Sequence, residues 1–436
     1  MDTFIKGEIM NKFILNIMND TDENRIIKRA TFWNMLASLI NSFLSSILLF
    51  IITRLSGATL AGVFSIASTV AYQCLSVGLF GTRNFHAADV SKEYSFTEYF
   101  YIRIISTIMM YGMLLYYVLF SNYDINKALI VLTFGLYKSV DCFEDLIHGE
   151  YHRQGRLDIA AILQSIRYII SLIAFVLVYV LTMNLLLTCF ITFVLSLLLC
   201  VIENLSICFH FVKEKLIFRF DKIKKLFGIL LPICISSFVH IYICNISKYA
   251  IDANLSSEIQ TYFSILIMPS FVISLLSEVI FRPYITRLSK CWHDKDIHHF
   301  KKLIYNQLLV ILILTIIVNI GGYVVGLRLL ELIYNVSIMK YMNCLLVLLT
   351  AGGFSTAFTF LSLVLTILRE QNKFLFIYII FAVVGKLLSN ILVIHYGIWG
   401  ASILYLGVCV AIFMSFSTML IAKIKSSNKT ITNEGE

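Results

Sequence analysis

The chain is constrained above all by long apolar runs that recur with short polar breaks between them. Of its 436 residues, 59% are hydrophobic and only 14% are charged, and the mean hydropathy is +0.85. About 20 apolar residues in a helix cross the roughly 30 Å hydrocarbon core of a bilayer. Backbone groups in lipid must be satisfied internally, and continuous rather than alternating apolar runs exclude a barrel. The sequence therefore predicts an all-α integral membrane protein.

Twelve membrane-spanning helices are predicted from these runs, joined by short loops. The predicted spans are 31–54, 57–80, 97–120, 127–147, 157–181, 185–210, 226–251, 259–281, 303–327, 341–368, 374–395 and 400–422. The basic linker 213–225 follows the sixth span, so we expect an N-lobe at 30–212, a C-lobe at 226–423 and tails at 1–29 and 424–436. The N-terminal tail is open to two interpretations, an interfacial amphipathic helix or a partly ordered segment.

A faint internal repeat relates the two lobes. The tripeptide Phe64–Ile66 in the second span recurs as Phe263–Ile265 in the eighth, and an arginine follows each phenylalanine by 19 residues, at Arg83 and Arg282. Lobes with an even number of spans are parallel repeats, related by an axis along the membrane normal. The expected architecture is therefore two six-helix lobes around a central cavity.

Basic residues are distributed unevenly between the predicted loops. Of the 35 lysines and arginines, 26 lie in the two tails and the even-numbered loops, whereas 4 lie in or beside the odd-numbered loops. Loops rich in Lys and Arg remain on the cytoplasmic side of a membrane. Both termini are therefore expected in the cytoplasm. This bias accounts for the formal net charge of +9, which does not indicate nucleic-acid binding.

The loop after the second span carries a polar run, GTRNFHAADVSKEYSFTEYFYIRI, from residue 81 to residue 104. We expect its side chains in water, with Ser95 capping the third span and Arg103 reaching the membrane interface. Its motifs are Arg83-Asn84, Ala88-Asp89, Tyr94-Ser95-Phe96 and Glu98-Tyr99, followed by Arg103. They resemble the corresponding loop of Wzx-type O-antigen and capsular polysaccharide flippases, which belong to the multidrug/oligosaccharidyl-lipid/polysaccharide exporter superfamily. The segments 29–67 and GIWGASI at 397–403 are similar to that family's first hairpin and last turn.

The resemblance implies a transporter and not an enzyme. Such flippases carry an undecaprenyl-diphosphate-linked oligosaccharide, the repeat unit of O-antigen lipopolysaccharide or capsule, across the bacterial inner membrane. They work by alternating access, and coupling to an ion gradient, as in an antiporter, is expected. A polysaccharide polymerase and a chain-length regulator are candidate partners besides membrane lipids. A monomer without cofactor, metal or nucleic acid is expected. The polar loop would be a cytoplasmic gate with Arg83, Asp89 and Arg282 as candidate residues, or simply a solvated connector.

Charged residues inside the fourth span narrow the function. A Lys or Asp at the centre of a span costs about 2.5–3.5 kcal/mol on insertion scales, so it normally faces a polar interior or a partner. Lys138, Asp141, Asp145 and His148 fall within about 80° of one helix face, and Glu144 lies about 40° outside that arc. We expect a hydrophilic stripe whose acids, Asp141, Glu144 and Asp145, exchange a proton or a sodium ion. The alternative is an internal ion pair of Lys138 with Asp141 or Asp145.

Cations near mid-membrane are candidates for binding the diphosphate of the substrate. Lys138, Arg167 in the fifth span and Lys386 in the eleventh could donate charge-assisted hydrogen bonds to it, and arginine could do so bidentately. Pairing of Arg167 and Lys386 with acids on other helices, such as Glu203 or Glu278, is the alternative.

Two asparagines and two prolines complete the set of candidate residues. Asn34 and Asn41 could contact sugar hydroxyls of the substrate or form hydrogen bonds between helices. Pro232 and Pro269 each remove a backbone hydrogen bond and should kink their helices.

Two other function classes compete with a flippase. A cation-coupled multidrug exporter of the same superfamily would have similar lobes and an amphiphilic drug as substrate, whereas mid-membrane cations favour an anionic substrate. A membrane-embedded polysaccharide polymerase or ligase would be expected to have a sizeable periplasmic loop with catalytic Arg or His. The odd-numbered loops of this chain are short and nearly uncharged.

Overall fold

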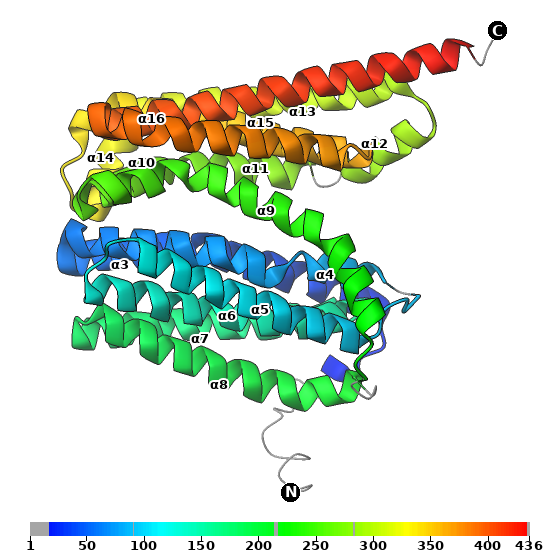
Figure 1. Cartoon of the computed structure of the whole chain (residues 1–436), viewed down its shortest axis with the longest axis horizontal. Coiled ribbons are helices and arrows are strands. Elements are labelled where there is room, and N and C mark those ends of the chain that lie inside the picture. Colours follow the sequence, from blue (N-terminus) through cyan, green and yellow to red (C-terminus); the bar gives the residue numbers. More distant parts are fainter. Residues whose placement is uncertain (1–16, 90, 213–216, 282–283, 434–436) are drawn as a thin grey trace, which may run out of the picture. The chain divides into compact units, whose positions relative to one another are not determined.

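The computed structural model describes residues 17–89, 91–212, 217–281 and 284–433, apart from the side chains of 203, 205, 206, 208–210, 278, 279, 286 and 427–433. Every regular element within these ranges is helical (Figure 1). The described residues form two compact units. Those within Met1–Ser56 and Val63–Phe238 form unit 1, and those within Gly57–Gly62 and Val239–Glu436 form unit 2. The division between the two units falls between Phe238 and Val239, inside a helix, whereas the sequence predicts a lobe boundary in the linker 213–225. The predicted lobe boundaries stay a prediction.

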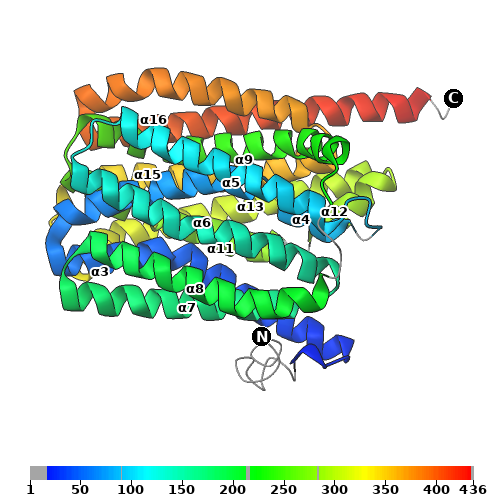
Figure 2. The same ribbon diagram turned by 60° about the horizontal axis from the view of Figure 1, so that its bottom comes forward.

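Unit 1 is built around its most polar helix. Its elements are α3 (Glu23–Leu79, without the Gly57–Gly62 segment), α4 (Thr82–Ala88), α5 (Phe96–Phe120), α6 (Ile125–Arg153), α7 (Leu157–Thr182), α8 (Leu185–Phe211) and the first part of α9 (Phe220–Asn254). Helix α6 packs against α4, α5, α7 and α8, and Figures 1 and 2 show α5 to α8 running side by side. It begins at Asp124, whose side chain accepts a hydrogen bond from the Lys127 amide at 3.2 Å.

Unit 2 is built around an apolar helix. Its elements are the second part of α9, α10 (Ser257–Ile267), α11 (Ser270–Phe281), α12 (Tyr284–His293), α13 (Ile297–Gly321), the π-helix η1 (Gly322–Gly326), α14 (Leu327–Tyr334), the 3₁₀ turn η2 (Met339–Tyr341), α15 (Met342–Ile367) and α16 (Gln371–Asn433). Helix α15 packs against α10, α11, α13 and α16. The repeated phenylalanines Phe64 and Phe263 are both fully buried, one in each unit.

The described part of the chain contains nine helical stretches that are long and apolar enough to cross a membrane. Two of them, Glu23–Ala88 and Gln371–Ser426, have 66 and 56 residues, about three times the length that one crossing needs. Helix α6, which carries the charges of the predicted fourth span, is not among the nine. A multi-pass membrane protein is therefore confirmed, and the count of twelve spans stays a prediction.

Glycine and proline interrupt the long helices where the sequence predicts turns or kinks. Gly57 in α3 has φ 84° and ψ 176°, and Gly397 in α16 has φ 56° and ψ −134°, conformations that side chains with a Cβ rarely adopt. Pro269 lies between the end of α10 and the start of α11, so the predicted kink in this region is confirmed. Pro232 lies inside α9.

The turn at Gly397 also requires a close approach of two backbone segments. A Cβ at Gly400 would lie 2.0 Å from the carbonyl oxygen of Leu392, whereas a Cβ at Gly407 in the same helix would have no heavy atom within 4 Å. We predict that Gly400→Ala lowers the free energy of unfolding by about 1–3 kcal/mol, because the backbone must move apart. Gly407→Ala is the matched control and should leave thermal stability nearly unchanged. Equal melting temperatures for the two purified variants would contradict this account.

Candidate functional site

The α6–α7 charge cluster consists of Lys138, Asp141 and Glu144 on α6 and Arg167 on α7. The Lys138 Nζ lies 3.0 Å from Asp141 Oδ2. The Arg167 Nη2 lies 2.5 Å from Asp141 Oδ1 and 2.6 Å from Glu144 Oε2, and its Nε donates to Glu144 Oε1 at 2.9 Å. Arg167 therefore donates two parallel hydrogen bonds to Glu144, and both Arg167 and Lys138 form an ion pair with Asp141. Two cations are balanced by two carboxylates.

The cluster is enclosed within unit 1. Lys138, Glu144 and Arg167 are 0% exposed, and Asp141 is 7% exposed. Charges this deeply buried are tolerated only where partners and hydrogen bonds replace the lost water. The pairing that the sequence left as an alternative, Lys138 with Asp141, is confirmed.

Aromatic rings and a hydroxyl complete the shell around the two cations. The Lys138 Nζ lies 4.7 Å from the centroid of the Tyr72 ring, 5.3 Å from that of Tyr137 and 5.6 Å from that of Tyr168. The Arg167 Nη1 donates to Ser196 Oγ of α8 at 2.8 Å, and the guanidinium stands over Tyr168 at 4.8 Å. Rings at these distances stabilise a cation, so both cations have favourable contacts beyond the carboxylates.

A second buried ion pair joins α5 to α6. The Arg103 Nη2 lies 2.6 Å from Asp145 Oδ2 and also donates to Thr82 Oγ1, while its Nη1 donates to the Gly78 carbonyl at 2.5 Å. The Arg83 Nη1 lies 3.8 Å from Asp145 Oδ1. Arg103 is 0% exposed, so the expectation that it reaches the interface was wrong. Its guanidinium lies inside unit 1 because Asp145 and the Gly78 carbonyl satisfy it there.

The predicted stripe on α6 is thus divided between two partners. Lys138 and Asp141 belong to the α6–α7 charge cluster, whereas Asp145 faces Arg103 of α5. Glu144, placed outside the stripe by helix geometry, is the residue that Arg167 binds through two hydrogen bonds. The three acids of α6 pair with basic residues on different neighbouring helices, Asp141 and Glu144 with Arg167 of α7 and Asp145 with Arg103 of α5. The ion-coupling roles of Asp141, Glu144 and Asp145 stay proposals.

The polar loop after α3 is tied to α6 by a third buried network. The His86 Nε2 lies 2.9 Å from Glu150 Oε2, and the His86 ring stacks on Tyr99 with centroids 3.9 Å apart. Arg153 pairs with Glu150 at 2.6 Å and donates to the Tyr94 carbonyl at 3.0 Å. The loop is therefore anchored to the fold, and its interpretation as a purely solvated connector is wrong for His86.

Asp89 organises the chain that follows this network. Its carboxylate accepts hydrogen bonds from the amides of Glu93 at 2.9 Å and Tyr94 at 3.0 Å and from the Tyr99 hydroxyl at 3.2 Å. Partial burial favours the neutral acid, but these donors outweigh it and hold the pKa of Asp89 below its usual value. Ser95 caps α5 together with Glu98, as the sequence predicts. Gate roles for Arg83 and Asp89 stay proposals.

Three of the remaining predicted site residues, Asn34, Asn41 and Lys386, lie within the described part of the chain. Asn34 and Asn41 are half-buried on α3, and Lys386 is exposed on α16 of unit 2. Lys386 has no ion pair with a described carboxylate, and the side chains of Glu203 and Glu278, the acids given as examples of an alternative partner, are not described. Arg282 lies outside the described residues.

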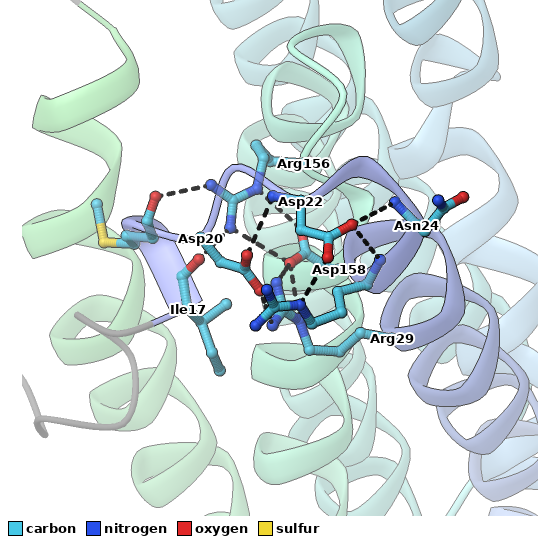
Figure 3. A network of polar contacts seen from close by, with 9 residues as sticks. Ile17, Asp20, Asp22, Asn24, Arg29, Arg156 and Asp158 are labelled. Carbon is cyan, nitrogen blue, oxygen red and sulfur yellow. Dashed lines mark hydrogen bonds and ion pairs between the residues drawn. The ribbon is translucent and has the colours of Figure 1, made fainter.

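An ionic network that the sequence did not predict fixes the start of α3 (Figure 3). The Arg29 Nη2 lies 2.6 Å from Asp158 Oδ2, and its Nη1 lies 3.0 Å from Asp20 Oδ2. Arg156 pairs with Asp158 at 3.0 Å and donates to the Ile17 carbonyl at 2.6 Å. Residues 23–29, expected in a tail, belong to α3 and are held against the α6–α7 turn.

Comparison with solved structures relates the whole described fold to membrane transporters. An inward-facing multidrug resistance MATE family transporter of the MOP superfamily matches at 12% sequence identity and a TM-score of 0.65, over 91% of this chain and 96% of that chain. The lipid II flippase MurJ in an inward closed conformation matches at 14% identity and a TM-score of 0.68, over 90% of each chain.

A third solved structure has the same fold. It is a MOP superfamily transporter from Pyrococcus furiosus, which matches at 13% identity and a TM-score of 0.54, over 95% of this chain and 97% of that chain. The chain has the fold of MOP superfamily transporters. No family model matches it, and no curated protein matches its sequence.

The balance of charge in the cluster generates a stability prediction. Arg167→Gln should lower the free energy of unfolding by about 3–5 kcal/mol, because Glu144 remains buried without its partner. The double variant Arg167→Leu, Glu144→Leu leaves Lys138 paired with Asp141 and should recover most of that loss. Denaturant titration of the purified proteins measures both. A double variant at least as unstable as the single variant would contradict the pairing.

Proposed function

We propose that the protein is a flippase that moves an undecaprenyl-diphosphate-linked oligosaccharide across the bacterial inner membrane by alternating access. The loop motifs resembling Wzx-type flippases support this, as does the fold shared with a lipid II flippase. The observation that carries the proposal is the α6–α7 charge cluster. It holds two cationic side chains, Lys138 and Arg167, inside a membrane helix bundle, where a diphosphate could replace the carboxylates that now pair with them.

The cluster could bind the substrate by exchanging partners. With both carboxylates ionised, Lys138 and Arg167 are balanced and offer no net positive charge. If Asp141 and Glu144 each bind a proton or a sodium ion, the same four residues gain two positive charges. These match the two or more negative charges of a diphosphate, which accepts charge-assisted hydrogen bonds from Lys and bidentate ones from Arg. Ion entry and substrate binding would then be coupled through the same side chains.

The remaining assignments follow from the same proposal. Lys386 would supply a further cation, and Asn34 and Asn41 would contact the glycan. Asp145, which pairs with Arg103 at 2.6 Å, would be a further ion-coupling acid. Both termini would lie in the cytoplasm, and a polymerase and a chain-length regulator would act on the product. The transporter fold favours these roles over that of a polymerase or ligase.

A cation-coupled multidrug exporter is the second candidate, favoured by the matching MATE family multidrug resistance transporter. In that case Asp141 and Glu144 would bind only the coupling ion, and Lys138 and Arg167 would neutralise the charge of these acids without contacting the substrate. The two candidates differ in the sign of the substrate charge.

Reconstitution into liposomes separates these two functions. The purified protein should move a fluorescent undecaprenyl-diphosphate-linked glycan between leaflets. The measurement is the fraction of fluorescence that a membrane-impermeant quencher removes, which rises as labelled glycan reaches the outer leaflet. A cationic dye such as ethidium, supplied to parallel vesicles, should not be accumulated. Dye transport without movement of the lipid-linked glycan would sink the flippase proposal and support the exporter.

The exchange of partners also predicts how transport depends on the ion gradient. Asp141→Asn should make glycan transport less sensitive to collapse of the proton and sodium gradients, because only one of the two carboxylates, Glu144, still has to be neutralised. Asp124→Asn is the control: it removes the same charge from the start of α6, and asparagine is an equally good N-cap. Gradient dependence in Asp141→Asn that equals that of the wild type would return Asp141 to a structural role.

A further inference from the structure

An elongated groove of about 380 Å³ lies on unit 2, between α13, α15 and α16. Its wall is apolar along most of its length, formed by Ile304 on α13, Leu361 on α15 and Leu420 and Ile424 on α16. Exposed apolar side chains, Tyr305 on α13 and Ile421 on α16, flank it. Apolar surroundings of this kind suit contact with the hydrocarbon of a bilayer.

One end of the groove is cationic. Lys301, in the second turn of α13, and Lys425, near the end of α16, both line it, and both side chains are exposed. Helix α13 runs away from this end and α16 runs toward it, so the two ammonium groups belong to the same mouth. Ser417 adds a hydroxyl farther along the groove.

Among the described residues, these two lysines have no acidic partner, in contrast to Lys373 and Lys423. Lys373 and Lys423 both bind Glu370, at 2.8 and 2.6 Å, and these hydrogen bonds hold the pKa of Glu370 below its usual value. Neither Lys301 nor Lys425 forms an ion pair with a carboxylate in the described part of the chain. The mouth of the groove therefore retains two uncompensated positive charges.

The groove is long enough for part of one acyl chain. The groove-lining residues of α13 lie between Lys301 and Leu308, eight residues whose seven steps rise about 10 Å along the helix. A basic mouth beside a lipid-facing apolar channel is complementary to a lipid whose phosphate lies at the interface and whose chain enters the hydrocarbon.

We propose that this groove is a binding site for an anionic phospholipid. The headgroup phosphate lies between Lys301 and Lys425, and one acyl chain follows Ile304, Leu361 and Leu420. The site is separate from the α6–α7 charge cluster and does not depend on what the protein transports. Its occupant is a resident lipid of the leaflet at which α13 begins and α16 ends.

Native mass spectrometry of the full chain tests this site. We expect the wild-type protein to retain dioleoyl phosphatidylglycerol in preference to dioleoyl phosphatidylcholine. Each basic residue contributes roughly a fivefold preference for an anionic lipid, so Lys301→Ala with Lys425→Ala should lower it by about thirtyfold. Lys301→Ala alone should lower it by about fivefold, and Lys302→Ala is the matched control for that single variant, because it removes one positive charge from the next position of α13, which does not line the groove.

A second variant tests the acyl chain separately from the headgroup. Ser417→Trp fills the groove without changing its charge and should reduce retention of phosphatidylglycerol. Retention unaffected by this variant, a loss in Lys302→Ala equal to that in Lys301→Ala, or equal retention of the two lipids by the wild type would each overturn the proposal. Displacement of the lipid by soluble glycerol 1-phosphate would also overturn it, by showing a site for the free phosphate group.

Discussion

The pairing of Arg167 with Glu144 and Asp141 is the interaction on which the rest of unit 1 depends. Helix α6 packs against α4, α5, α7 and α8, although it carries more charge than the helices around it. An isolated ion in such a place would cost several kcal/mol, and removing one partner of a buried pair typically costs about 3–5 kcal/mol. The helix can occupy the centre of the unit because each of its buried acids meets a cation. The same requirement positions α5 through Arg103 and the polar loop through His86 and Arg153.

Basic side chains have opposite environments in the two units. In unit 1, Lys138 and Arg167 are buried and paired with carboxylates, so the cluster has no net positive charge until a carboxylate is neutralised. In unit 2, Lys301 and Lys425 stand uncompensated beside an apolar groove, where an anionic lipid can reach them. The first arrangement suits a switch, because a small change of protonation alters a large local charge. The second suits a permanent surface contact.

The helical elements and several of their breaks could be predicted from the sequence, because long apolar runs and the conformations of Gly397 and Pro269 are local properties. The buried cations Lys138 and Arg167 could be found for the same reason. Their partners could not, since the choice between Asp141, Glu144 and Asp145 depends on where α5 and α7 pack against α6. Helix geometry placed Glu144 about 40° outside the arc of the other charges, yet the long Arg167 side chain reaches it from the neighbouring helix. Arg103 was misplaced because the Gly78 carbonyl that satisfies it lies on another helix.

The central claim is that the substrate diphosphate takes the place of the carboxylates around Lys138 and Arg167. A structure determined by electron cryomicroscopy with an undecaprenyl-diphosphate-linked glycan bound would test it most directly. The account predicts diphosphate oxygens within hydrogen-bonding distance of the Lys138 Nζ and the Arg167 guanidinium, with Asp141 and Glu144 drawn away from both. A bound glycan whose diphosphate lies elsewhere, with the four-residue cluster still paired as in the structure described here, would contradict it.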